Sequence, residues 1–278
     1  MGLSVTVCIA AMCLNCIVTV SDRRLTYSDL IEAPDDATLK AFKLPGDWGL
    51  LFAASDLSPV QMLVEDIRAR LKPLKDSLTA KTVQEHVREA YRAAHQNQVV
   101  DHILGRYGLK SVEDFRRNGF AEFGFEIFSQ LVERIEKFDL GVSLLVYGFN
   151  DGPQHISNIF AVENPGVIID HQLEGFGVIG SGSWPALASM TFRGVTGLGS
   201  LSEAVYRLCE AKFRAETASG VGRATTVMIF AHDGRMHQLP PGIIDKLREI
   251  WDLESKVPVS EEVFSVLGDR RKHLIFDD

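Results

Sequence analysis

Three side chains that could act as nucleophiles lie on alternate residues near the start of the sequence: Ser4, Thr6 and Cys8. Side chains alternate along a β-strand, so all three would point to one face of a strand. A hydroxyl or thiol attacks a carbonyl carbon when an adjacent base removes its proton. The chain then returns through a second apolar run that ends at Asp22. This pattern indicates a nucleophile and a carboxylate carried by one hairpin.

The hairpin that would position them is predicted over residues 4–24. Two runs of alternating Val, Thr, Ile and Ala flank Leu14 and Asn15, which is typical of two strands and a turn. No basic segment precedes Leu3, so a signal peptide is not expected. The polar residues recur with period two, unlike those of a membrane-spanning helix. A loose myristoylation pattern at Gly2 leaves a membrane-tethered protein as the least favoured alternative.

Composition limits the classes of function. The chain has 278 residues, 46% of them hydrophobic, which suits one large globular domain. A net charge of −8 argues against nucleic-acid binding, which needs clustered Lys and Arg. Three of the four cysteines fall within the first hairpin, so they do not form a secreted disulfide framework. Cys13-x-x-Cys16 has no second ligand pair to complete a zinc site, and we expect neither metal nor cofactor.

The predicted elements come in segregated runs, which favours an α+β domain. Strands are predicted up to residue 54, again over 142–179, and over 225–231. Helices are predicted to begin with Ser58 as N-cap, at a Thr82–Glu85 capping box, near residue 184, and at a Ser200–Glu203 capping box. We expect a single domain over 1–278, with a helical insertion at 98–138 and a C-terminal extension at 241–278. Five phenylalanines gather in that insertion, and we expect them to pack together.

Five short segments carry a resemblance to a known family. They are Ser21-Asp22-Arg23-Arg24-Leu25-Thr26, Lys40-Ala41-Phe42-Lys43-Leu44, Ala53-Ala54-Ser55, Gly180-Ser181-Gly182-Ser183 and Glu216-Thr217-Ala218-Ser219-Gly220. In this order, each at a predicted strand or helix boundary, they resemble motifs of the proteasome β-type subunits and their smaller bacterial relatives. The chain thus looks like a divergent bacterial-type proteasome homologue. The resemblance implies the N-terminal-nucleophile hydrolase fold, a four-layer αββα sandwich.

The same resemblance implies roles for individual residues. The nucleophile would be the first residue of a processed chain, with its own α-amine as base. Lys40 would lower the pKa of that amine and stabilise developing negative charge, and Asp22 would orient Lys40. The turn at Ala54 would supply an oxyanion donor, and Thr26 would line the substrate site. The polar surround of the amine would comprise Ser181, Glu216 and Ser219.

Plainer interpretations of these residues stand beside the catalytic ones. Asp22 and Lys40 could form an ordinary ion pair at strand ends. Ser181 and Ser219 could simply satisfy helix ends. The identity of the nucleophile is also open: aligning the apolar pair Val7 and Ile9 with the family selects Ser4, our first choice, whereas counting back from Asp22 selects Thr6. Either choice requires cleavage of the chain.

The resemblance implies an N-terminal-nucleophile amidohydrolase, in particular a threonine- or serine-type peptidase that acts on peptide or protein substrates. It further implies a cytoplasmic homo-oligomer, a ring or related assembly, which an ATP-dependent unfoldase could serve. The alternative is a non-catalytic scaffold subunit of the same fold. Loss of residues 1–3 or 1–5 from the purified protein would favour the enzyme, and loss of Met1 alone the scaffold.

Overall fold

A computed structural model describes residues 6–24, 26–27, 31–32, 40–152, 155–195 and 199–255, with only the backbone described at 26–27 and 31–32. Its central feature is the predicted hairpin of β1 (Cys8–Met12) and β2 (Cys16–Asp22), which pair antiparallel from Cys8 opposite Ser21 to Met12 opposite Ile17. All five residues of β1 are buried, because both of its faces are covered.

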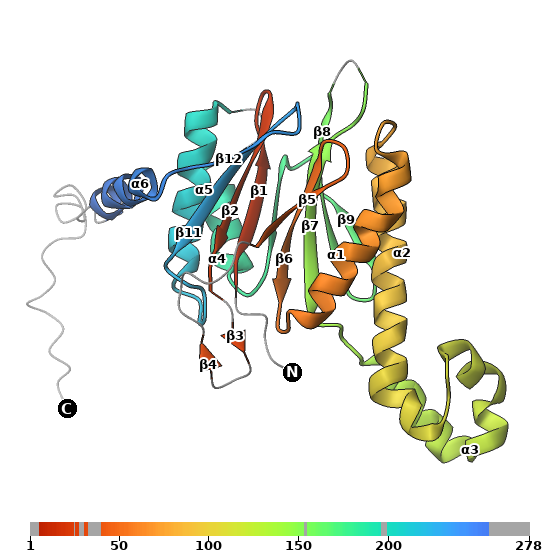
Figure 1. Cartoon of the computed structure of the whole chain (residues 1–278). Helices are drawn as coiled ribbons and strands as arrows, with labels where there is room; N and C mark the ends of the chain where they lie inside the picture. Colours follow the sequence, from red (N-terminus) through yellow and green to blue (C-terminus); the bar gives the residue numbers. More distant parts are fainter. Residues whose placement is uncertain are drawn as a thin grey trace, which may run out of the picture.

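The hairpin is part of a five-stranded antiparallel sheet (Figure 1). Strand β10 (Phe176–Ile179) pairs with β1 on one side of the hairpin. On the other side β11 (Thr225–Ala231) pairs with β2, and β12 (Met236–Gln238) follows it. Segments distant in sequence, near residues 6, 180 and 222, therefore meet at one end of this sheet.

A second five-stranded antiparallel sheet consists of β5 (Ala41–Leu44), β6 (Trp48–Ala54), β7 (Val142–Phe149), β8 (Ser157–Glu163) and β9 (Val167–Asp170), in that order. A short two-stranded sheet pairs β3 (Thr26–Tyr27) with β4 (Ile31–Glu32). The two larger sheets confirm the predicted mixed α+β class.

Three clusters of buried side chains show how the sheets and helices pack. One cluster lies between the sheets and combines Cys8 and Ile17 with Leu51 and Leu145. A second joins the β5–β9 sheet to α1 (Ser58–Leu71) and α2 (Ala80–Val99). A third joins the hairpin sheet to α4 (Ser183–Phe192), α5 (Leu201–Ala215) and α6 (Pro241–Glu254). Burial of this apolar surface stabilises both sheets by the hydrophobic effect.

The predicted helical insertion contains a π-helical turn (Val100–Leu104), a 3₁₀ turn (Gly105–Tyr107) and α3 (Val112–Glu136). The backbone of α3 leaves helical geometry at Gly124, where φ is 70°. Figure 1 shows this region extending beyond the end of α2. Its phenylalanines pack together in part: the ring of Phe128 contacts those of Phe115 and Phe120, whereas Phe125 is 74% exposed.

Helix starts agree with the sequence only in part. The Ser200 hydroxyl accepts a hydrogen bond from Glu203 N at 3.3 Å, as predicted. Helix α2 begins at Ala80 instead of Thr82, because the Thr79 hydroxyl caps it through Thr82 N. Helix α1 already includes Ser58, and the residue before it makes no side-chain cap. Within the described residues, no helix is long and apolar enough to cross a membrane.

Candidate active site

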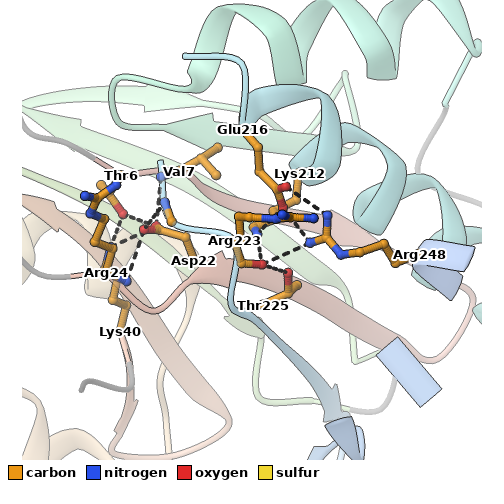
Figure 2. A network of polar contacts seen from close by, with 11 residues as sticks. Thr6, Val7, Asp22, Arg24, Lys40, Lys212, Glu216, Arg223, Thr225 and Arg248 are labelled. Atoms are coloured by element: carbon orange, nitrogen blue, oxygen red, sulfur yellow. Dashed lines mark hydrogen bonds and ion pairs between the residues drawn. The ribbon is translucent and has the colours of Figure 1, made fainter. Parts of the chain in front are cut away.

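Thr6, Asp22 and Lys40 meet between the two sheets (Figure 2). Thr6 precedes β1, and Asp22 is the last residue of β2. The Thr6 hydroxyl donates to Asp22 Oδ1 and accepts from the Lys40 ammonium. Lys40 Nζ lies 2.8 Å from Asp22 Oδ1. All three residues are at most 2% exposed, so their mutual hydrogen bonds replace contacts with water.

Lys40 reaches this point from the opposite sheet. It immediately precedes β5, and its carbonyl oxygen accepts from Phe52 N at 3.3 Å, which extends the β5–β6 pairing to its position. Thr6 and Asp22 belong to the hairpin sheet, where Asp22 N donates to Val7 O at 3.2 Å. The register of two separate sheets thus determines where the ammonium, the carboxylate and the hydroxyl lie.

Main-chain donors orient the Asp22 carboxylate. Oδ1 accepts from Val7 N at 3.1 Å, in addition to Thr6 and Lys40. Oδ2 accepts from Arg24 N at 3.2 Å and from Gly222 N at 3.3 Å. The sequence did not indicate the Gly222 contact, because a backbone N–H in a turn has no residue signature.

The Gly180-Ser181-Gly182 segment surrounds the main chain of Thr6. Ser181 Oγ accepts from Thr6 N at 3.1 Å and lies 3.4 Å from Thr6 O, while Gly182 N donates to Thr6 O at 3.0 Å. Gly180 has φ of 96°, and a Cβ there would lie 2.4 Å from Thr6 O. Glycine is required by this close approach. Ser181 does not cap α4, which has no side-chain cap bond.

Ala54 is the last residue of β6, at the same end of the sheets. Phe52 N donates toward β5, to Lys40 O, whereas Ser55 N donates to Gly141 O on the β7 side. Successive N–H groups of an antiparallel strand alternate between its two neighbours. The Ala54 N–H therefore points to the β5 side, beyond Lys40.

Cys8 shares the face of Thr6 but lies deeper between the sheets, fully buried, with Sγ 3.3 Å from Phe52 O. Burial raises the pKa of its thiol to about 12, although Lys40 acts in the opposite direction. A thiol of such pKa stays protonated at neutral pH, and the thiolate is the nucleophilic form. Cys8 is therefore not a competing nucleophile.

Two residues of the predicted polar surround lie elsewhere. The Glu216 carboxylate pairs with Lys212, at 2.5 Å, and with Arg248, at 2.6 Å. Ser219 is exposed. Within the described residues, neither makes a hydrogen bond to Thr6 or Ser181. Sequence reasoning missed Lys212 and Arg248; the i,i+4 spacing of Lys212 and Glu216 was a signal for the first, whereas Arg248 comes from a distant helix.

The structure describes the remaining predicted site residues only in part. Ser4 lies outside the described residues. Thr26 is the first residue of β3, with its side chain outside the description. No group of three or more His, Cys, Asp or Glu residues within the described ranges could hold a metal ion.

Comparison with known proteins gives a structural relationship. No family model matches the sequence, and no curated protein matches it. Solved structures with a similar fold include a Gly-1 mutant of Anbu from Hyphomicrobium sp. strain MC1, with a TM-score of 0.61 over 92% of this chain and 99% of that chain. Another is Anbu, an ancestral beta-subunit, from Yersinia bercovieri, with a TM-score of 0.60 over 91% and 98%. Sequence identity is 16% in both.

These findings correct the sequence-based family assignment. The prediction that the chain is a divergent member of the proteasome β-type subunit family was wrong, because no family model supports it and the similar solved structures are Anbu proteins. What stands is that the chain shares its fold with these Anbu structures.

Proposed function

We propose that the protein is an N-terminal-nucleophile amidohydrolase, acting as a peptidase, with Thr6 as its nucleophile. The observation that carries this proposal is the position of the Thr6 hydroxyl, which contacts both the Lys40 ammonium and the Asp22 carboxylate in a buried setting. Nucleophilic hydroxyls need such an environment, with a base at hand and positive charge nearby.

Cleavage of the bond before Thr6 would convert its main-chain nitrogen into an α-amine. That nitrogen already lies 3.1 Å from Ser181 Oγ. An α-amine has a pKa of about 7.7–8.0, so it can accept the hydroxyl proton at neutral pH. The hydroxyl oxygen then attacks the substrate carbonyl, and the amine returns the proton to the leaving amine. Water attacks the resulting ester in the same way and regenerates the free hydroxyl.

The other residues would act through charge and orientation. Lys40 lowers the pKa of the amine and stabilises the alkoxide character of the attacking oxygen. Asp22 holds the ammonium in place through its 2.8 Å contact. The Ala54 N–H, on the β5 side of its strand, would donate to the oxyanion of the tetrahedral intermediate. This role follows from its direction and from the motif in which it lies.

Thr6 is preferred here to Ser4, the first choice from sequence, because the contacts to Asp22 and Lys40 belong to Thr6. We further infer that the helices and sheets form the four-layer αββα sandwich and that the protein works as a cytoplasmic homo-oligomer. The description of one solved relative as a beta-subunit supports assembly. Peptides or proteins would be the substrates, and an ATP-dependent unfoldase is a candidate partner.

Hydrolysis of a panel of fluorogenic peptide amides tests the proposal. Wild-type protein should release the fluorophore, Thr6→Ala should release none, and Thr6→Ser should retain part of the rate because it keeps a hydroxyl on the same carbon. Ser181→Ala serves as a matched loss of one hydroxyl beside the amine and should lower the rate less than Thr6→Ala does. Activity of Thr6→Ala equal to wild type would refute the assignment.

A further inference from the structure

A buried cluster of charges lies next to the candidate site, on the far side of Asp22 (Figure 2). Lys212 in α5 is fully buried and its Nζ donates to Glu216 Oε1 at 2.5 Å. Arg248 in α6 binds both oxygens of the same carboxylate, at 2.6 and 2.8 Å. Its guanidinium also lies 4.0 Å from the ring centroid of Phe213. The cluster joins the end of α5 to α6.

The cluster converges on a single main-chain carbonyl. Arg223 O accepts from Lys212 Nζ at 2.7 Å and from Arg248 Nη2 at 2.9 Å. The Thr225 hydroxyl donates to it as well, at 3.2 Å. Charge-assisted hydrogen bonds are roughly twice as strong as neutral ones, so two cations hold this carbonyl firmly.

The carbonyl is one residue from a direct contact with the site. Gly222, the neighbour of Arg223, donates its N–H to Asp22 Oδ2 at 3.3 Å. Only a few backbone torsions separate the Arg223 carbonyl from the Gly222 N–H, and glycine is the residue most able to rotate about them. Without the hydrogen bonds from the two cations, the Gly222 N–H would lose the direction that aligns it with the Asp22 carboxylate.

We infer that Lys212, Glu216 and Arg248 act as a positioning cluster, which holds the turn at residues 222–223 against Asp22 and so fixes the carboxylate that contacts Thr6 and Lys40. The part of this inference that concerns the reaction rests on the proposed function. It gives Glu216 a positioning role through the turn at residues 222–223, in place of the position in the polar surround of the amine that the resemblance implied.

The protonation of Lys212 gives the cluster a recognisable signature. Burial lowers the pKa of Lys212 to about 8, with a further contribution from Arg248 in the same direction, while Glu216 and Asp22 oppose it. Among the described residues, the Cys209 thiol on α5 also interacts with Lys212, and burial raises the pKa of this thiol to about 12. Deprotonation of Lys212 weakens its bond to Arg223 O, because the charge assistance is lost.

A kinetic comparison of Lys212→Met with Arg214→Met tests the inference. Arg214 is a matched control on the same helix: it binds the buried carboxylate of Glu210 at 3.0 Å, which Arg193 and Arg207 also bind. Lys212→Met leaves Glu216 paired with Arg248, so the charges stay balanced. Toward one fluorogenic peptide amide, kcat of Lys212→Met should fall on the order of tenfold, with KM changed by less than about twofold.

The pH profile separates positioning from a general structural effect. Wild-type kcat should decline above a pH of about 8, and this decline should be absent in Lys212→Met and present in Arg214→Met. An unchanged kcat and pH profile in Lys212→Met would overturn the inference. Where Lys212→Met does not fold, Arg248→Lys, which keeps the charge but loses the two-oxygen contact, should show the same selective loss of kcat.

A readout without turnover keeps this inference distinct from the proposed function. The Gly222 amide resonance in the full chain should shift with pH through the titration of Lys212, and the shift should vanish in Lys212→Met. If it does so in a protein without peptidase activity, the proposed function fails and the positioning cluster stands. If the Gly222 amide resonance does not shift with pH while Thr6-dependent hydrolysis is present, the inference fails and the proposed function stands.

Discussion

Thr6 lies 16 residues before Asp22 and Asp22 lies 18 residues before Lys40, yet their side chains share one buried set of hydrogen bonds. The sequence could predict the pairing of Asp22 with Lys40 because the segments at 21–26 and 40–44 resemble known motifs. It could not predict the position of Glu216. This carboxylate pairs with Arg248, which is close in space but 32 residues away in the sequence. The choice of Thr6 over Ser4 also depended on the structure.

Replacing Lys40 tests the charge balance among these residues. Lys40→Met should abolish peptide hydrolysis, because the cation beside the nucleophile is gone. It should also destabilise the fold by about 3 kcal/mol, because the Asp22 carboxylate stays buried without its cation. Urea unfolding measures the second effect. Lys43→Met is the control, since Lys43 is an exposed residue of the same strand whose ammonium donates to Gly234 O at 2.6 Å; it should retain activity. Full activity in Lys40→Met would contradict the mechanism.

At the scale of elements, strand ends and glycine turns bring the site together. The hairpin over β1 and β2 could be predicted from its alternation and its Leu14-Asn15 turn. The approach of the Gly180-Ser181-Gly182 segment to Thr6 could be predicted only as a motif, because it depends on β10 pairing with β1. The N-cap of α2 was predicted three residues late, at Thr82 instead of Thr79, because the two threonines are equally plausible caps by composition.

A substitution at Gly180 tests the close approach of this segment. Gly180→Ala should destabilise the protein by about 2 kcal/mol, because it combines a left-handed φ with a Cβ placed against Thr6 O. It should also lower the hydrolysis rate, since Ser181 moves with the segment. Gly194 has φ of 60° and open space around its Cβ position, so Gly194→Ala isolates the backbone effect. Equal stability losses in the two variants would show that the contact is unimportant.

For the molecule as a whole, segregated runs of strands and helices were enough to predict an α+β protein, whereas two antiparallel sheets were implied only by the family resemblance. The order of strands in each sheet could not be predicted, because residues 40–54 pair with residues 142–170 through contacts that leave no local pattern. The single-domain boundary at 1–278 and the insertion at 98–138 stay predictions. Phe125 in α3 is 74% exposed, so the gathering of phenylalanines in the sequence did not by itself show which of them are covered.

The free energy of unfolding should depend on pH through the protonation of Lys212. Its pKa is lowered from 10.5 to about 8 by burial, so between these values the unfolded chain binds the proton and the folded chain does not. The free energy of unfolding therefore rises with pH across this window, by about 3 kcal/mol at most. The wild-type value minus that of Lys212→Met should show this rise in urea titrations. A flat difference between pH 8 and about 10.5 would mean that Lys212 titrates normally.

The intact mass of the purified full chain shows whether Thr6 becomes its first residue. We expect loss of residues 1–5, which leaves Thr6 at the N-terminus, and retention of those residues in Thr6→Ala. Loss of residues 1–3 would move the nucleophile to Ser4. A wild-type protein that loses Met1 alone, and whose mass matches that of Thr6→Ala apart from the substitution, would contradict the account and leave a non-catalytic subunit.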